Sequence, residues 1–119
     1  MAKVMVVDDS QFMRLTIQTM LVAGHHEVVA QAENGPQAVE QYKKYRPEVV
    51  TMDIIMPVAS GLEAVSQIIK FDPAARILMV SAMGQEKIVQ DAMRLGAKGF
   101  LGKPVKAIEL LEKISQSLK

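Results

Sequence analysis

Five polar side chains in this sequence follow short apolar runs, and together they could hold a divalent cation and a phosphoryl group. The runs are AKVMVV, EVVTM, RILMV and KGFLG, and the polar residues after them are Asp8, Asp9, Asp53, Ser81 and Lys103. Carboxylate oxygens suit a hard cation such as Mg²⁺. An ammonium and a hydroxyl nearby suit the negative oxygens of a phosphoryl group in transfer.

The elements that must position these side chains are short strands alternating with amphipathic stretches. The β-branched runs predict strands over residues 3–7, 27–32, 48–52, 76–80 and 99–101. Each run is followed by a stretch with helical spacing of its apolar residues. The chain therefore alternates strand and helix five times.

Capping and breaking residues delimit the predicted helices. Ser10 is a suitable N-cap for the first helix, and Pro36 suits the first turn of the second. The third is expected over residues 60–71, the fourth ends at Gly96, and the fifth follows Pro104. Helical spacing turns these apolar side chains, among others, toward the core: Phe12, Ile17, Leu21, Ile108 and Ile114.

Strict alternation of this kind predicts an α/β fold with a doubly wound parallel sheet covered by helices on both faces. A chain of 119 residues fits a single domain, which we expect over residues 1–119. In such sheets ligands bind outside the carboxyl ends of the strands. The five polar residues are therefore expected to meet at one edge of the sheet.

Composition narrows the classes of function. The net charge of +1 predicts neither nucleic-acid binding nor attraction to an anionic membrane. The chain has no cysteine, so disulfides and thiolate metal sites are excluded. No apolar run approaches the roughly 18 residues that span a bilayer, and no signal-peptide pattern is present. We expect a cytoplasmic protein without membrane insertion.

Asp53 is the best candidate for a nucleophile among the acids. It leaves an almost wholly apolar segment, where a lone charge is costly unless a cation or hydrogen-bond donors meet it. An aspartate in such a site can accept a phosphoryl group as an aspartyl phosphate. Asp8 and Asp9 would hold the metal, whereas His25 and His26 lie at the opposite end of a helix and are poor ligand candidates.

Taken singly, each of these residues also has a structural interpretation. Asp8 and Asp9 could favour a helix N-terminus, and Asp53 could be a turn residue. Ser81 could be a loop hydroxyl, and Lys103 a solvated charge. The coincidence of all of them at four strand ends favours a functional site.

The ordered set resembles the receiver domain of bacterial two-component response regulators over essentially the whole chain. The similar segments are VVDDS at residues 6–10, TMDIIMP at 51–57, SAMG at 81–84 and GFLGKP at 99–104. The segments DDSQFMR and MVSAMGQ, without an output domain, are most similar to the stand-alone chemotaxis regulators of that family. The resemblance implies a flavodoxin-like fold with strand order 2-1-3-4-5.

The resemblance also implies a metal site and a phosphoacceptor. Asp53 would accept the phosphoryl group and also contribute to the metal site, where Asp9 would bind Mg²⁺ directly and Asp8 would act through water. The backbone carbonyl of Ile55 would complete the protein ligands, and Mn²⁺ could replace Mg²⁺.

The remaining site residues implied by the resemblance respond to the phosphoryl group. Ser81 and Lys103 would bind it, and Phe100 would be the switch aromatic that turns inward with Ser81. The Lys103–Pro104 peptide bond would be cis, against about 5–6% of X-Pro bonds in folded proteins.

By the same resemblance the protein is a switch and not an enzyme. A histidine kinase would donate the phosphoryl group, and the surface of the fourth helix, fifth strand and fifth helix would change its affinity for a protein target. The implied partners are a flagellar motor switch protein and a phosphatase, in chemotaxis.

The sequence departs from the family pattern in two respects. Val105 follows the Lys-Pro pair where an aromatic is common, and Ala59 and Ser60 replace a bulky apolar residue and an acid or amide. Ile55 and Met83 are apolar at positions that flank the incoming water, which predicts a long-lived phosphoryl group with slow autodephosphorylation.

Three other functions have distinct signatures. A haloacid-dehalogenase-type phosphatase would carry its nucleophile after the first strand in an Asp-x-Asp pattern. A flavin-binding electron carrier would cradle phosphate in the first loop, where Asp8 and Asp9 would repel it. A receiver that only docks, without phosphorylation, would leave the complete site unexplained.

Overall fold

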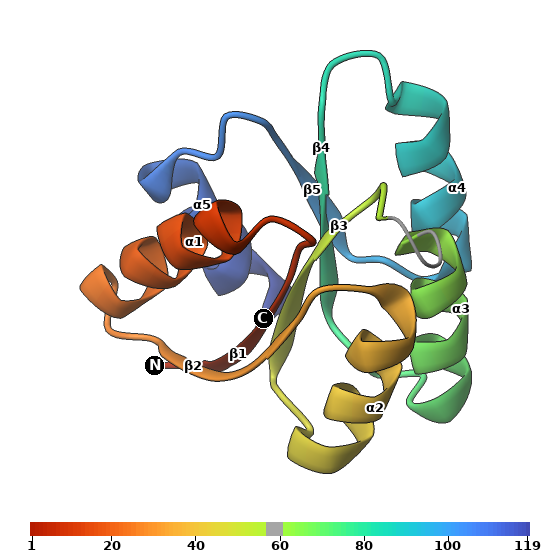
Figure 1. Ribbon diagram of the computed structural model, residues 1–119, viewed down its shortest axis with the longest axis horizontal. Coiled ribbons are helices and arrows are strands. Elements are labelled where there is room, and N and C mark those ends of the chain that lie inside the picture. Colours follow the sequence, from red (N-terminus) through yellow and green to blue (C-terminus); the bar gives the residue numbers. More distant parts are fainter. Residues whose placement is uncertain (57–60) are drawn as a thin grey trace.

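The computed structural model describes residues 1–56 and 61–119, which form five strands and five helices in strict alternation (Figure 1). The strands are β1 (Lys3–Val7), β2 (Glu27–Ala32), β3 (Val49–Asp53), β4 (Ile77–Ser81) and β5 (Gly99–Gly102). The helices are α1 (Gln11–Ala23), α2 (Gly35–Tyr45), α3 (Gly61–Phe71), α4 (Glu86–Leu95) and α5 (Ala107–Ser117).

All the strands are parallel and lie in the order β2-β1-β3-β4-β5. Helices α1 and α5 cover one face of the sheet, and α2, α3 and α4 cover the other (Figure 1). The winding reverses between β1 and β3, and the carboxyl ends of strands at such a reversal are where ligands bind in sheets of this kind. The predicted fold class and strand order are confirmed.

The two faces of the sheet carry separate apolar cores. Met5 and Val7 contribute to the core under α2, α3 and α4, whereas Val4 and Val6 contribute to the core under α1 and α5. This division follows from the period of two along a strand. Because β1, β3 and β4 are covered on both sides, their sequences are apolar almost throughout.

The strands β3 and β4 run one residue further than the sequence pattern predicted. Asp53 pairs with Val80, and Ser81 pairs with Gly102, so both polar residues are the last members of their strands. Apolar patterning stops at the first polar residue, but the backbone hydrogen bonds of the sheet continue through it. Consequently the backbones of Asp53 and Ser81 are fixed by the sheet.

The predicted inward positions of Phe12 and Ile108 are wrong. Phe12 is 74% exposed and Ile108 is 82% exposed. In α1 the buried residues are Ile17 and Leu21, and Phe12 lies about 140° around the helix from Ile17. In α5 Leu110 is buried instead, about 160° from Ile108. Both residues are apolar, but each lies on the side of its helix that faces solvent.

The start of α3 is fixed by a close approach to β3. The Gly61 N–H donates to the carbonyl oxygen of Ile54 at 2.8 Å, and a Cβ at Gly61 would lie 2.6 Å from the carbonyl oxygen of Asp53. Glycine is therefore required at this point. The predicted helix start at Ser60, the departure at Ala59 and the motif residue Pro57 lie outside the described residues.

Within residues 1–56 and 61–119, no helix combines the length and the apolar character needed to cross a bilayer.

Candidate functional site

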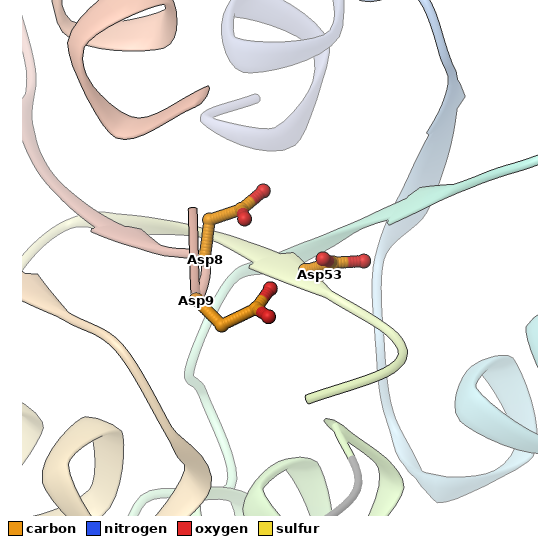
Figure 2. Close-up of side chains that lie close together, drawn as sticks. All are labelled: Asp8, Asp9 and Asp53. Carbon is orange, nitrogen blue, oxygen red and sulfur yellow. The ribbon is translucent and has the colours of Figure 1, made fainter. Parts of the chain in front are cut away.

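Three carboxylates gather at the carboxyl edge of the sheet (Figure 2). Asp8 and Asp9 directly follow β1, and Asp53 ends the neighbouring strand β3. One carboxylate oxygen from each lies within 4.8 Å of the others. The sequence prediction that these three side chains meet is confirmed.

Asp8 is the most deeply buried of the three, with 1% of its surface exposed. Its Oδ1 accepts a hydrogen bond from the Ser10 N–H at 2.9 Å, but its Oδ2 is buried without a partner in the described structure. Burial raises the pKa of the Asp8 carboxyl, and the nearby charge of Asp53 raises it further, against the lowering effect of the Ser10 hydrogen bond. The charged form of Asp8 is therefore poorly stabilised without a cation.

Asp53 is 5% exposed and has one charged partner of opposite sign. The Lys103 Nζ donates to Asp53 Oδ2 at 3.3 Å, a distance at the long end for a charged hydrogen bond. Burial raises the pKa of the Asp53 carboxyl, while the charge of Lys103 and a backbone hydrogen bond from Ile55 lower it. Asp9 adds a smaller rise through its negative charge. The shift upward means that Lys103 alone does not compensate for burial.

The donor set of this cluster fits Mg²⁺. The oxygens are hard ligands, they come from three carboxylates, and the unpartnered Oδ2 of Asp8 marks a position where a hydrogen-bond donor or a cation is needed. The carbonyl of Ile55 as a further ligand stays a prediction. His25 and His26 precede β2 at the opposite edge, and the Nδ1 of His26 already accepts a hydrogen bond from the backbone N–H of Ala2.

Ser81 and Lys103 reach the same edge from β4 and the loop after β5. Ser81 is 8% exposed, and its carbonyl accepts a hydrogen bond from the backbone N–H of Lys103 at 2.8 Å. The Lys103–Pro104 peptide bond is cis, as predicted. The hydroxyl, the ammonium and Asp53 are thus anchored by neighbouring strands.

Phe100 lies in an outward position on β5. It is 49% exposed, and the Nζ of Lys113 lies 5.9 Å from the centre of its ring. A cavity of about 710 Å³ separates β5 from α4 and is lined by Ser81, Met83 and Phe100 among others. The structure therefore holds space beside Ser81 into which an aromatic ring could move.

Two polar contacts at this edge were not predicted from the sequence. The Arg14 guanidinium donates to the backbone carbonyl of Asp8 at 2.7 Å, and the Ala82 N–H donates to Gln85 Oε1. Arg14 had a detectable signal, since it is the one charged residue of α1 and lies a turn after the acidic pair. Gln85 had none, because a polar residue before a helix is expected in any case.

The model of the response regulator receiver domain matches residues 4–115 of this chain. The chain belongs to the response regulator receiver family. This receiver is 50% identical to the chemotaxis protein CheY of Bacillus subtilis over 116 residues, which cover 98% of this chain and 97% of the relative. It is 43% identical to the chemotaxis protein CheY of Thermotoga maritima, over 96% and 98% of the two chains.

Solved structures of the family have the same fold as this receiver. A chain of the CheX-CheY-BeF3-Mg²⁺ complex from Borrelia burgdorferi matches it with a TM-score of 0.93 and 33% identity, over 98% of this chain and 89% of the other. The response regulator domain of Thermotoga maritima CheB matches with a TM-score of 0.90 and 40% identity, over 98% and 95%. Relatives of this kind are consistent with two-component signalling and chemotaxis.

Proposed function

We propose that this receiver accepts a phosphoryl group on Asp53 from a histidine kinase in a Mg²⁺-dependent reaction. The observation that carries the proposal is the position of the Asp53 carboxylate. It is buried at the end of β3, 3.3 Å from the Lys103 ammonium and within 4.8 Å of the oxygens of Asp8 and Asp9. The pattern expected of a phosphatase does not fit this arrangement, because the candidate nucleophile lies on β3 and not after β1.

The transfer requires one new bond and one broken bond. An Asp53 carboxylate oxygen attacks phosphorus, the P–N bond of the donor phosphohistidine breaks, and the imidazole nitrogen keeps the electron pair and takes up a proton. Lys103 stabilises the negative charge on the phosphoryl oxygens, and the Ser81 hydroxyl donates to one of them. Mg²⁺ held by Asp8 and Asp9 would neutralise the carboxylates and the phosphoryl oxygens when bound.

The output is a change in the surface of α4, β5 and α5. Ser81 moves toward the phosphoryl group, and Phe100 turns into the cavity between β5 and α4. A partner that binds the inward arrangement more tightly than the outward one is then recruited. The relatives named as chemotaxis proteins support chemotaxis as the pathway, in which we propose a flagellar motor switch protein as that partner, and the CheX-CheY-BeF3-Mg²⁺ complex supports a second protein that binds the receiver, which we propose to be a phosphatase.

The aspartyl phosphate is expected to be long-lived. Ile55 is 58% exposed and Met83 is 96% exposed, and neither side chain offers a polar group to orient an attacking water. The phosphoryl group of a labelled sample should persist well beyond seconds in the absence of other proteins. Its complete loss within seconds would contradict this expectation.

The phosphoacceptor is tested by labelling with radioactive acetyl phosphate in Mg²⁺. We expect the Asp53→Asn variant to lose labelling entirely, because an amide is not a nucleophile at this step. Asp72→Asn is the matched control, since Asp72 is a carboxylate at the opposite edge of the sheet and bonds to Tyr42. Undiminished Mg²⁺-dependent labelling of Asp53→Asn would overturn the assignment.

A further inference from the structure

A second hollow, of about 510 Å³, lies between α5 and the first residues of β4 and β5, away from the acidic site. Its lining is strongly basic and includes Arg76, Lys98, Lys113 and Lys119, with Leu78 in its wall. None of the described lining side chains is acidic. In a protein of net charge +1, this is a local concentration of positive charge that needs an explanation.

The basic side chains of this hollow form no ion pair within residues 1–56 and 61–119. The ion pairs of the described chain involve Lys87, Arg94 and Lys103, and neither Arg76, Lys98 nor Lys113 takes part in one. Arg76 acts on Asp72 only as a minor cause of the lowered pKa of that carboxyl. Like charges gathered in a hollow attract an anion because their potentials add.

We propose that this basic hollow binds an acidic segment of a protein partner. The cations come from four places in the chain, before β4, before β5, on α5 and after α5, so the complementary ligand carries several spaced charges rather than one. The lining contains no aromatic side chain on which a base could stack, which disfavours single-stranded nucleic acid. A run of Asp or Glu side chains fits both observations.

The hollow is continuous with the proposed switch surface through Lys113. The same residue lines a neighbouring hollow together with Phe100, Glu109 and Glu112, and its Nζ lies 5.9 Å from the centre of the Phe100 ring. A carboxylate bound in the basic hollow competes with this ring for the Lys113 ammonium. When Phe100 leaves its outward position, Lys113 becomes available to the acidic segment. This coupling rests on the proposed function, whereas binding itself does not.

Binding is tested by NMR titration of the ¹⁵N-labelled full chain with a hexaglutamate peptide at low salt. We expect saturable shifts of the amides near Lys98 and Lys113. Reversing two charges in the variant Arg76→Glu/Lys98→Glu should weaken binding by at least about tenfold, as expected for the loss of two ion pairs. The matched control carries two reversals elsewhere, at Lys44 and Lys70, which are exposed on α2 and at the end of α3. Equal affinities of the two double variants would overturn the proposal.

Two other ligands serve as competing probes in the same titration. Inorganic phosphate should bind more weakly than the peptide at equal charge concentration, because it cannot reach all the cations at once. Tighter binding of inorganic phosphate would indicate a small-anion site instead. Tighter binding of a single-stranded oligonucleotide with the same number of charges would indicate nucleic acid, and either result would overturn the proposal.

The coupling is tested separately with beryllofluoride and Mg²⁺. Treated wild-type protein should bind hexaglutamate about threefold more tightly than untreated protein, because a surface cation–π contact has been released. The variant Lys113→Met should lose this difference, and Asp53→Asn should bind the peptide as untreated protein does. Peptide binding without acetyl phosphate labelling would refute only the proposed function, and labelling without peptide binding would refute only the basic hollow.

Discussion

The two ends of the sheet differ in how fully their polar groups are paired. At the amino end the carboxylates and the imidazole accept hydrogen bonds from nearby donors. The bonds are Lys3 N–H to Glu48 Oε1 at 2.9 Å, Ala2 N–H to His26 Nδ1 at 3.0 Å, Ala74 N–H to Asp72 Oδ1 at 3.1 Å and Tyr42 O–H to Asp72 Oδ2 at 2.7 Å. At the carboxyl end Asp8 Oδ2 is buried with no hydrogen-bond partner among the residues that the structure describes.

The pKa values of the carboxyl groups follow this difference. The hydrogen bond from Tyr42 lowers the pKa of Asp72, whereas burial raises the pKa values of Asp8 and Asp53. A carboxylate with a lowered pKa stabilises the fold, and one with a raised pKa costs stability in its charged form. The comparison teaches that the carboxylates of the amino end contribute stability, while those of the carboxyl end hold charge at a cost in stability, as the proposed cation site requires.

The largest expected effect is stabilisation of the carboxyl end by Mg²⁺. At a concentration 100 times its Kd, Mg²⁺ should raise the free energy of unfolding by about 2.7 kcal/mol, measured by urea denaturation. The variant Asp9→Asn should lose most of this increment because one metal ligand is gone. Asp91→Asn is the control, since Asp91 lies on α4 and pairs with Arg94. An unchanged increment in Asp9→Asn would break the comparison.

The next effect concerns the amino end. Replacing Tyr42 by Phe removes a hydrogen bond to a carboxylate and should lower the free energy of unfolding by about 1.5 kcal/mol. Because the folded pKa of Asp72 is lowered, its contribution is fully present above the unfolded value of 3.8 and is lost as pH falls through the folded pKa.

The cost of Tyr42→Phe should therefore be constant from neutral pH to about pH 4, near the unfolded pKa of a carboxyl group, and shrink below it. Tyr45→Phe, at a residue that is 44% exposed, should have little effect at any pH. Urea denaturation at several pH values measures both variants. A Tyr42→Phe cost that grows on acidification would contradict the assigned role of Asp72.

Removing the charge of one aspartate should change the free energy of unfolding by a smaller amount, and in opposite directions at the two ends of the sheet. In the absence of Mg²⁺, Asp53→Asn should raise the free energy of unfolding by an amount on the order of 1 kcal/mol, the usual size of a single-residue effect. The gain follows from removing a buried charge that Lys103 only partly compensates. Asp72→Asn should instead lower stability, because the Tyr42 hydroxyl loses a charged acceptor. A lower free energy of unfolding in both variants would show that the buried charge of Asp53 does not destabilise the fold.

The smallest effect concerns His26. Burial lowers its pKa from 6.5, so the neutral form contributes stability above pH 6.5 that is lost as pH falls through this value toward the folded pKa. His26→Gln should therefore lose less stability than the wild type between pH 7 and pH 5.5, in parallel thermal unfolding curves. His25→Asn is the control, because Asn tolerates the positive φ of 67° found there. Identical pH profiles of wild type and His26→Gln would refute this role.

The sequence was sufficient to predict the alternation, the strand order and the meeting of the three acids. The alternation and the meeting of the acids depend on the period of the apolar residues and on the parallel sheet that it predicts, whereas the strand order was implied by the resemblance to receiver domains. The exact strand ends were not predictable, since hydrogen bonding carries β3 through Asp53 and β4 through Ser81 beyond the apolar pattern. The sequence also did not show how each helix is rotated about its own axis against the sheet. For this reason Phe12 and Ile108 were predicted to be buried, although both are exposed.

The finer geometry of the site depends on side-chain burial that no spacing rule provides. Asp8 and Asp9 are equivalent in the sequence, yet Asp8 is 1% exposed and Asp9 lies in solvent. This difference in exposure depends on the backbone conformation of the loop after β1, which buries the Asp8 side chain at the edge of the sheet and leaves that of Asp9 exposed. The pairing of Tyr42 with Asp72 joins residues 30 apart and had no local signal.

The strand β5 has a further consequence for how copies of this protein behave at high concentration. As an outer strand of the sheet it presents backbone donors and acceptors to which another chain could add. It is only four residues long, and exposed Lys98 and Lys103 flank it. Short length and flanking positive charge oppose edge-to-edge aggregation, so the lysine proposed to attract an acidic partner also keeps identical molecules apart.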